Sequence, residues 1–220
     1  GTFKSRIQGH EREHTVRIGN TQFHSVYFDR FRPHYEPEVV AAMAILLGTG
    51  KARPGDFLDI GANWGHFVGI ALSFPAFKGR VFAFEPEPDS YQDLTRFVRS
   101  LGDPLAERVV CQRQAVTCRT DAKLRIGVQR GFHTGLACLS QAGRGTECDL
   151  VALDHTPAVP IALAKLDIEG HEDQAIEGMR CTLQAQKPYV IFESHWDETS
   201  NHAYRHLSEL GYGFVLMRYR

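Results

Sequence analysis

Four acidic residues stand where this chain has the clearest potential for chemistry. Asp59, Glu85, Asp167 and Glu193 each lie at the end of, or directly after, a short apolar run. Short apolar runs bounded by turn residues are typical of buried strands. The carboxyl ends of parallel strands meet at one edge of a sheet, where ligands of open α/β folds bind. We therefore expect the four carboxylates to converge on one ligand-binding edge.

The stretch around Asp59 predicts a cradle for a nucleotide. It runs Phe-Leu-Asp-Ile-Gly-Ala-Asn-Trp-Gly over residues 57–65, so Asp59 is followed by Gly61 and Gly65. Glycines leave the backbone bare where it bends and where a ligand must approach closely. A helix is expected over residues 64–73, and its free N–H groups and positive dipole end would face the same turn.

The spacing of the acidic residue and the glycines indicates which nucleotide fits. A dinucleotide fold usually carries G-x-G-x-x-G, whereas this order is D-x-G-x-x-x-G. S-adenosylmethionine (SAM) has no phosphate but carries an ammonium and a sulfonium, which a carboxylate at the strand end suits. Glu85 stands twenty residues after Gly65 and would accept both ribose hydroxyls of an adenosine. Two alternatives remain open: an NAD(P)-linked oxidoreductase, which lacks its third glycine here, and a non-catalytic SAM-binding module.

Composition limits the partners and the setting of the protein. A net charge of −1 gives no electrostatic case for nucleic acid or an acidic membrane surface. The Asn/Asp-Pro-Pro-Tyr/Phe motif that would hold a flipped base is absent, and so is any apolar run long enough to insert into a membrane. The five cysteines form no C-x-x-C pair. We expect reduced thiols, no zinc site and a cytoplasmic location.

The order of predicted elements indicates an α/β fold with a mostly parallel central sheet and helices on both faces. Residues 1–34 are expected to form a small β element packed on the core, with a hairpin around Gly19-Asn20, and residues 35–220 the main domain. Strands are expected at 57–60, 81–84, 108–112, 161–166, 188–192 and 213–217, and helices at about 37–47, 64–73, 88–101 (capped by Asp89), 172–185 and 200–210. Strands at 123–128 and 150–153 flank a Gly-rich stretch, 130–145, which predicts a β-ribbon across the ligand mouth.

A set of short motifs resembles the FkbM family of SAM-dependent methyltransferases. The motifs are Tyr-Glu-Pro-Glu at 35–38, Asp-Ile-Gly-Ala-Asn-Trp-Gly at 59–65, Phe-Glu-Pro at 84–86, Leu-Asp at 153–154, Lys-Leu-Asp-Ile-Glu-Gly-His-Glu at 165–172 and Ile-Phe-Glu at 191–193. The resemblance implies the Rossmann-like, seven-stranded class I methyltransferase fold and methylation of a hydroxyl oxygen on a natural product, sugar or lipid. Two features depart from the family pattern: His171 stands where a small residue is common, and only one strand is readable after Leu210, where a β-hairpin is usual.

The resemblance also implies roles for individual residues. It assigns the amino-acid part of SAM to Asp59, Gly61, Asn63 and Gly65, and the ribose to Glu85. We also expect cofactor contacts from Glu36 and Asp167.

Methyl transfer to a hydroxyl also needs a group that removes the hydroxyl proton. The candidate bases are His195, His171 and Asp167, because they follow predicted strands at the ligand mouth and imidazole titrates near neutrality. Asp167 with Glu169 or Glu193 could instead form an oxygen-rich site for Mg²⁺. Alternatively, Glu169 only caps the following helix, and His171 and His195 are solvated loop residues. We expect the small-molecule acceptor under the ribbon, around Phe132 to Leu139, and we expect His24, His155, His202 and His206 at the surface.

Overall fold

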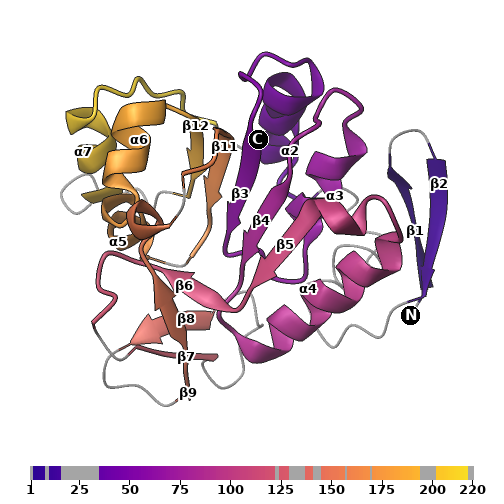
Figure 1. Cartoon of the computed structure of the whole chain (residues 1–220), viewed down its shortest axis with the longest axis horizontal. Coiled ribbons are helices and arrows are strands. Elements are labelled where there is room, and N and C mark those ends of the chain that lie inside the picture. Colours follow the sequence, from indigo (N-terminus) through magenta and orange to yellow (C-terminus); the bar gives the residue numbers. More distant parts are fainter. Residues whose placement is uncertain are drawn as a thin grey trace.

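Five parallel strands form the central sheet of the computed structural model (Figure 1). The structure describes residues 2–7, 10–15, 35–121, 124–128, 137–140, 145–156, 158–168, 170–193 and 202–217. The strands are β3 (Asp56–Ile60), β4 (Val81–Phe84), β5 (Val109–Gln112), β11 (Ile161–Leu166) and β12 (Tyr189–Phe192), in the order β12-β11-β3-β4-β5. Each lies within a residue or two of a predicted strand, so the predicted α/β fold is confirmed.

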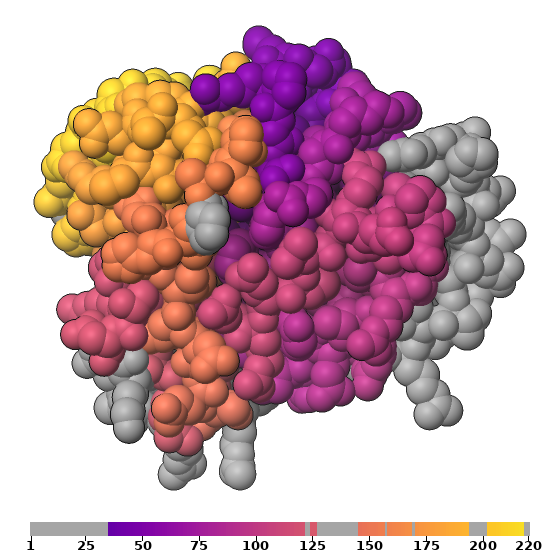
Figure 2. Space-filling view, in the orientation of Figure 1, coloured from indigo at the N-terminus to yellow at the C-terminus, as the bar shows by residue number. Residues whose placement is uncertain are grey.

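Helices cover both faces of this sheet. One face carries α2 (Pro37–Met43), which continues into the π-helical turn η1 (Ala44–Gly48), together with α3 (His66–Ser73) and α4 (Pro88–Leu101). The other face carries α5 (Glu172–Glu177), α6 (Arg180–Gln186) and α7 (His202–Glu209). On the face of the molecule drawn in Figure 2, the orange and yellow C-terminal helices lie beside the indigo segment around α2. In the described ranges, no helix is long and apolar enough to span a membrane.

Alternate residues along the strands separate the two cores. Phe57 of β3 and Leu163 of β11 belong to the core under α2, α3 and α4. Their neighbours Leu58 and Ala164 belong to the core under α5, α6 and α7. Successive side chains of a strand point to opposite faces, so a strand buried on both faces is apolar at most of its positions. This requirement explains why these strands were readable as continuous apolar runs.

Two helices differ from their predicted form. The α4 helix is capped by Glu87, whose carboxylate accepts the Ser90 N–H at 2.6 Å, so the predicted cap at Asp89 is wrong. The helix predicted over residues 172–185 is divided into α5 and α6 at Gly178. A Cβ on Gly178 would lie 2.5 Å from the carbonyl oxygen of Thr117, so this point of the chain is held against another segment.

Two smaller sheets lie beside the central one (Figure 1). Strand β6 (Gln114–Val116), which was not predicted, pairs in parallel with β10 (Asp149–Val151), and the 3₁₀ turn η4 (Leu153–His155) follows β10. Strands β7 (Arg125–Val128), β8 (Ala137–Ser140) and β9 (Thr146–Glu147) form an antiparallel sheet in the order β8-β7-β9. A β-ribbon is therefore present in the predicted region, but β10, which was predicted to flank it, pairs with β6 instead.

The N-terminal segment also forms a hairpin, but not the predicted one. Strand β1 (Thr2–Ile7) pairs antiparallel with β2 (His10–Thr15). The two strands contact α3 and α4 respectively. The hairpin predicted around Gly19-Asn20 lies outside the described residues, except for His14 and Thr15, which end β2.

The strand predicted over residues 213–217 is not formed. This segment is irregular, and its side chains from Phe214 to Met217 are exposed. The Phe214 ring contacts the rings of Tyr204 and Phe192, with centroids 4.2 and 6.5 Å away, but the segment joins no ladder. Within the described ranges the central sheet therefore has five strands instead of the seven that the family resemblance implied.

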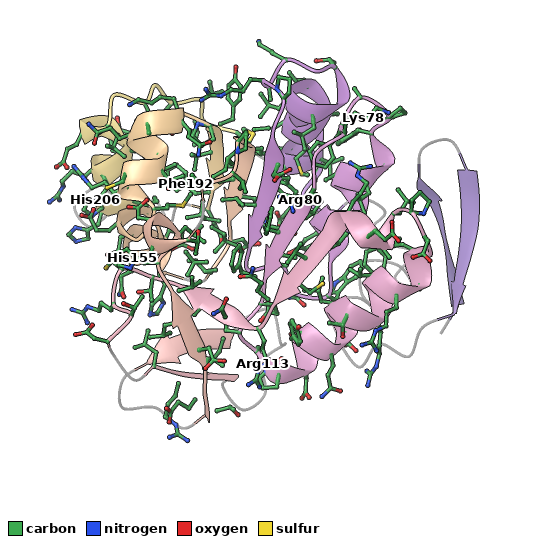
Figure 3. The ribbon with its side chains drawn as sticks, viewed as in Figure 1. Lys78, Arg80, Arg113, His155, Phe192 and His206 are labelled. Carbon is green, nitrogen blue, oxygen red and sulfur yellow. The ribbon has the colours of Figure 1, made fainter. Side chains whose placement is uncertain are left out.

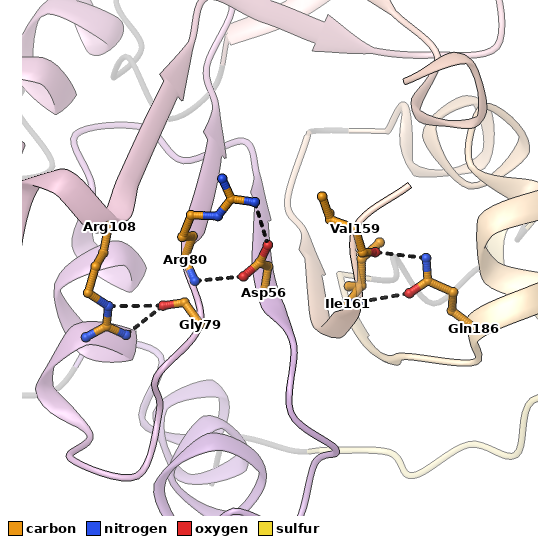
Figure 4. A network of polar contacts seen from close by, with 7 residues as sticks. All are labelled: Asp56, Gly79, Arg80, Arg108, Val159, Ile161 and Gln186. Atoms are coloured by element: carbon orange, nitrogen blue, oxygen red, sulfur yellow. Dashed lines mark hydrogen bonds and ion pairs between the residues drawn. The ribbon is translucent and has the colours of Figure 1, made fainter. Parts of the chain in front are cut away.

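Polar contacts secure the amino end of the central sheet (Figure 4). The Asp56 carboxylate accepts the Arg80 N–H at 2.8 Å, and the Arg80 guanidinium donates back to it at 3.3 Å. Arg108 donates to the carbonyl oxygen of Gly79 at 2.7 and 3.1 Å. Gln186 bonds the backbone on both sides of the start of β11. The opposite, carboxyl end of the sheet carries the predicted ligand-binding residues.

Candidate functional site

The turn after β3 forms the predicted glycine cradle. Gly61, Asn63 and Gly65 have positive φ angles of 86°, 50° and 97°. A Cβ on Gly61 would overlap the carbonyl oxygen of Asp167, and one on Gly65 would lie 2.8 Å from the ring of Phe97. Glycine is therefore required at both positions by contact as well as by conformation. The backbone N–H of Gly61 donates to the carbonyl oxygen of Phe84 at 2.9 Å, which ties the turn to the neighbouring strand.

Asp59 is buried at this end of the sheet without a hydrogen bond to its carboxylate. Its side chain has no exposed surface, and neither oxygen has a hydrogen-bond partner among the residues that the structure describes. Burial raises the pKa of Asp59 to about 6, and Asp167 and Glu36 add to the effect, while Lys165 opposes it. A buried carboxylate without hydrogen bonds is costly, and such a group calls for an explanation. A cationic ligand that donates hydrogen bonds to Asp59 would explain why this carboxylate is buried.

Glu85 joins the glycine turn to the start of α4. Its carboxylate accepts the backbone N–H of Asn63 and that of Glu87, each at 2.8 Å. Burial raises the pKa of Glu85 to about 7, and these two backbone N–H groups oppose the shift. Each carboxylate oxygen has two lone pairs, so capacity remains for hydroxyl donors of a ligand.

A buried ion pair lies between β11 and the turn. The Lys165 ammonium donates to Oδ2 of Asp167 at 2.9 Å and lies 4.3 Å from the centre of the Phe67 ring. Burial lowers the pKa of Lys165, but the carboxylates of Asp167, Asp59 and Glu36 outweigh that effect and raise it above its ordinary value. Lys165 therefore carries a permanent positive charge near these three carboxylates.

The rings of Tyr35, His66 and Phe67 lie together next to Lys165. The Tyr35 ring lies 5.4 Å from the His66 ring and 6.4 Å from the Phe67 ring. Burial, with a further contribution from Lys165, lowers the pKa of His66 to about 4, so its imidazole is neutral at neutral pH.

Glu36, directly before α2, adopts a left-handed conformation with φ 44° and ψ 58°. Non-glycine residues rarely adopt this conformation, and such strain tends to occur at functional sites.

Three of these residues were not predicted from the sequence as part of the site: Tyr35, His66 and Lys165. The signal for Lys165 was a charged residue inside a fully apolar run, because lysine is almost never buried without a partner. The signal for His66 was its place directly after the glycine turn. Tyr35 stood in a family motif, but no role was assigned to it.

The structure places only some of the predicted acid–base and metal residues. Asp167 and Glu193 follow adjacent strands β11 and β12, and Glu193 is exposed. His171 precedes α5, and its Nδ1 atom is buried without a hydrogen-bond partner in the described chain. Glu169 and His195 lie outside the described residues. The described part of the chain contains no group of three His, Cys, Asp or Glu side chains that could hold a metal ion.

Other residues named from the sequence have structural or surface positions. Asp154 accepts the backbone N–H groups of Cys181 and Thr182, both at 2.8 Å, so it caps α6. His155 and His202 are exposed and His206 is half-buried. Figure 3 shows His155 and His206 at the periphery of the molecule. Cys111, Cys118, Cys148 and Cys181 are free thiols, as predicted.

Known proteins resemble this chain in fold and in family. A search of curated protein sequences found no match. The crystal structure of methyltransferase FkbM from Methylobacillus flagellatus KT has a TM-score of 0.50 and 20% identity, over 80% of this chain and 43% of that one. The chain thus spans less than half of that protein's length. Precorrin-6y C5,15-methyltransferase from Geobacter metallireducens GS-15 has a TM-score of 0.46 and 15% identity, over 82% of this chain and 74% of that one.

The family comparison is more specific than the structural ones. The first structural match shows the α/β Rossmann-like fold, since its identity is too low to show more. The model of the family described as methyltransferase FkbM domain matches residues 59–214, which include the glycine turn, Glu85, Asp167 and Glu193. This match supports methyl transfer as the activity. The chain belongs to the FkbM methyltransferase family.

Proposed function

We propose that this chain is a SAM-dependent O-methyltransferase whose acceptor is the hydroxyl group of a small molecule. The observation that carries the proposal is the buried Asp59 carboxylate, which has no hydrogen-bond partner in the described chain and lies next to the glycine turn. The ammonium and sulfonium of SAM are the kinds of group that such a carboxylate would stabilise. A dinucleotide pyrophosphate would instead bring negative charge to a group that is already destabilised by burial.

The cofactor contacts follow from the positions of the side chains and the bare backbone. Asp59 would hold the ammonium of the amino-acid part, and Glu85 would accept the ribose hydroxyls. Gly61, Asn63 and Gly65 would line the same end of the cofactor with backbone groups, as the family resemblance implies, and their positive φ angles give the tight turn that this requires. Glu36 and Asp167 complete the proposed set. When bound, SAM supplies a methyl group already activated by its sulfonium.

The protein must then orient the acceptor and remove its proton. Positioning alone can supply a large part of the rate enhancement when both reactants are held in line. His195, His171 and Asp167 are the candidate bases for the hydroxyl proton. Oδ2 of Asp167 already accepts a hydrogen bond from Lys165, so Asp167 has less free capacity than an imidazole. We therefore favour a histidine, with His195 first because it comes shortly after β12 in the sequence.

The nature and location of the acceptor are inferred from charge and topology. A net charge of −1 provides no attraction to a nucleic acid backbone. The family resemblance favours a hydroxyl of a small molecule such as a natural product, a sugar or a lipid. The β-ribbon formed by β7 and β8 follows β6 in the chain, and we place the acceptor beneath it. A cytoplasmic location remains our expectation from the cysteine usage.

Calorimetric titration with S-adenosylhomocysteine (SAH), with NAD⁺ and NADP⁺ titrated in parallel, tests the proposal. We expect SAH alone to bind, with a dissociation constant on the order of micromolar, or about −8 kcal/mol. The variant Asp59→Asn should bind SAH at least about tenfold more weakly, whereas the exposed Asp121→Asn should bind like the parent. Binding of a dinucleotide without SAH would overturn the proposal. Binding of SAH without transfer to any hydroxyl of an acceptor panel would indicate a binding module.

A further inference from the structure

Lys165 is buried among acidic side chains at the proposed cofactor site. Its side chain is 3% exposed, and its ammonium lies 2.9 Å from Oδ2 of Asp167. The face of the Phe67 ring lies 4.3 Å from the same ammonium. Lysine is almost never fully buried unless it is paired, and an aromatic face adds a favourable contact for a desolvated cation. The surroundings of Lys165 therefore suit a fixed positive charge.

The strand register brings more than one carboxylate to this ammonium. Lys165 of β11 is paired with Asp59 of β3, so the two side chains leave the same face of the sheet on neighbouring strands. Asp167 follows β11, and Glu36 reaches the cluster from the segment before α2. One ammonium thus interacts electrostatically with three carboxylates from three separate parts of the chain, and of these three Asp167 is the one within ion-pair distance.

This arrangement does not fit the Mg²⁺ site considered from the sequence. Mg²⁺ requires near-octahedral oxygen ligands at about 2.0–2.1 Å. Asp167 is the carboxylate shared by every metal set that the sequence suggested, and its Oδ2 atom already accepts a hydrogen bond from the Lys165 ammonium. A divalent ion on that carboxylate would lie close to a fixed like charge, the ammonium of Lys165, whose side chain is buried. The donor set therefore suits lysine and disfavours a divalent metal.

We propose that Lys165 is the resident cation of this acidic cluster and takes the place of a divalent metal ion on Asp167. The ammonium bonds Asp167 directly, and it makes no hydrogen bond with Asp59, whose carboxylate stays available for a cationic ligand. Asp167 itself lies against the glycine turn, since its carbonyl oxygen is the atom that a side chain at position 61 would overlap. The proposal rests on the proposed function only for the identity of that ligand.

Titration of the full chain with Mn²⁺, followed by electron paramagnetic resonance, tests the role of Lys165. Mn²⁺ is a paramagnetic substitute for Mg²⁺ at oxygen sites. We expect the wild type to bind no Mn²⁺ at concentrations up to about 1 mM. Lys165→Met removes the charge from a side chain of similar shape. Asp59, Asp167 and Glu36 can then turn toward one ion, and Mn²⁺ should bind with a dissociation constant of about 0.1 mM or below. Lys165→Arg keeps the charge and should exclude Mn²⁺ as the wild type does.

The outcomes separate this proposal from its alternatives. Stoichiometric Mn²⁺ binding by the wild type that is lost in Asp167→Asn would overturn it, because Asp167 would then be a metal ligand. A folded Lys165→Met chain that still binds no Mn²⁺ would also overturn it. A Lys165→Met chain that fails to fold while Lys165→Arg folds would support a required buried cation. SAH titration of the wild type tests the proposed function separately, since the Mn²⁺ result is obtained on the free protein.

Discussion

Replacing Asp59 by asparagine should stabilise the ligand-free protein at neutral pH while it weakens cofactor binding. Burial is the main cause that raises the pKa of this carboxyl from 3.8 to about 6. A carboxyl whose pKa is raised on folding favours the folded state only while it is protonated. That contribution is present at low pH and is lost as pH rises through about 6. Asparagine carries no charge at any pH and avoids this loss.

The magnitude follows from the size of the pKa shift. A shift of about two units corresponds to about 3 kcal/mol of destabilisation at about pH 8, at about 1.4 kcal/mol per unit. The buried amide of asparagine adds a cost of about 1–3 kcal/mol if it stays without partners, but that cost does not depend on pH. The pH-dependent part is isolated by comparing two conditions. Between about pH 4.5 and about pH 8, the stability of Asp59→Asn relative to the wild type should rise by about 2 kcal/mol.

Urea unfolding at these two pH values, without ligand, measures this difference. For a domain of this size, about 2 kcal/mol corresponds to about 4–8 °C in Tm, so thermal unfolding provides a second readout. Asp121→Asn removes a carboxylate from the exposed surface and serves as the matched control, with no such change expected. A stability difference for Asp59→Asn that is the same at both pH values would refute the reasoning, because the carboxylate would then carry no burial cost. SAH calorimetry on the same samples shows whether the residue that lowers stability is the one that binds ligand.

Three further predictions concern other residues of the proposed site. Glu85→Ala should weaken SAH binding by at least about tenfold in calorimetry, because it removes a charged hydrogen-bond acceptor; unchanged affinity would remove Glu85 from the site. His195→Ala should bind SAH like the parent but transfer methyl groups about 10²–10⁴-fold more slowly in an assay with labelled SAM; weaker SAH binding would indicate a cofactor contact instead. Gly61→Ala should lower Tm, because its Cβ would overlap the backbone of Asp167; an unchanged Tm would contradict the close contact at this turn.

The strands of the central sheet could be predicted closely because each of them reads as an apolar run with a clear end. All residues of β11 are buried, and so are all those of β3. The convergence of Asp59, Glu85 and Asp167 could also be predicted, since it requires only that the strands be parallel. Details of strand order were not needed for that inference.

The features that were predicted wrongly depend on contacts between distant segments. The break between α5 and α6 occurs where Gly178 lies against Thr117, and the local apolar spacing is the same in a continuous helix. The residues from Phe214 to Met217 have the composition of a strand, but a strand forms only where a neighbouring edge pairs with it. Glu87 and Asp89 are both acidic residues near the start of α4. The helix begins directly after Glu87, so Glu87 instead of Asp89 is its cap.

The charge balance of the site illustrates the same limit. The sequence shows four carboxylates at the ends of predicted strands, and these residues alone suggest a metal ion that neutralises them. The neutralising charge is instead inside β11, and its partners are set by the pairing of Lys165 with Asp59 across two strands more than a hundred residues apart. Because one ammonium faces three carboxylates, the cluster keeps an excess of negative charge, which favours a positively charged ligand. A methyl donor that carries a sulfonium and an ammonium matches that excess, and Lys165 accounts for why the cluster can exist before such a ligand arrives.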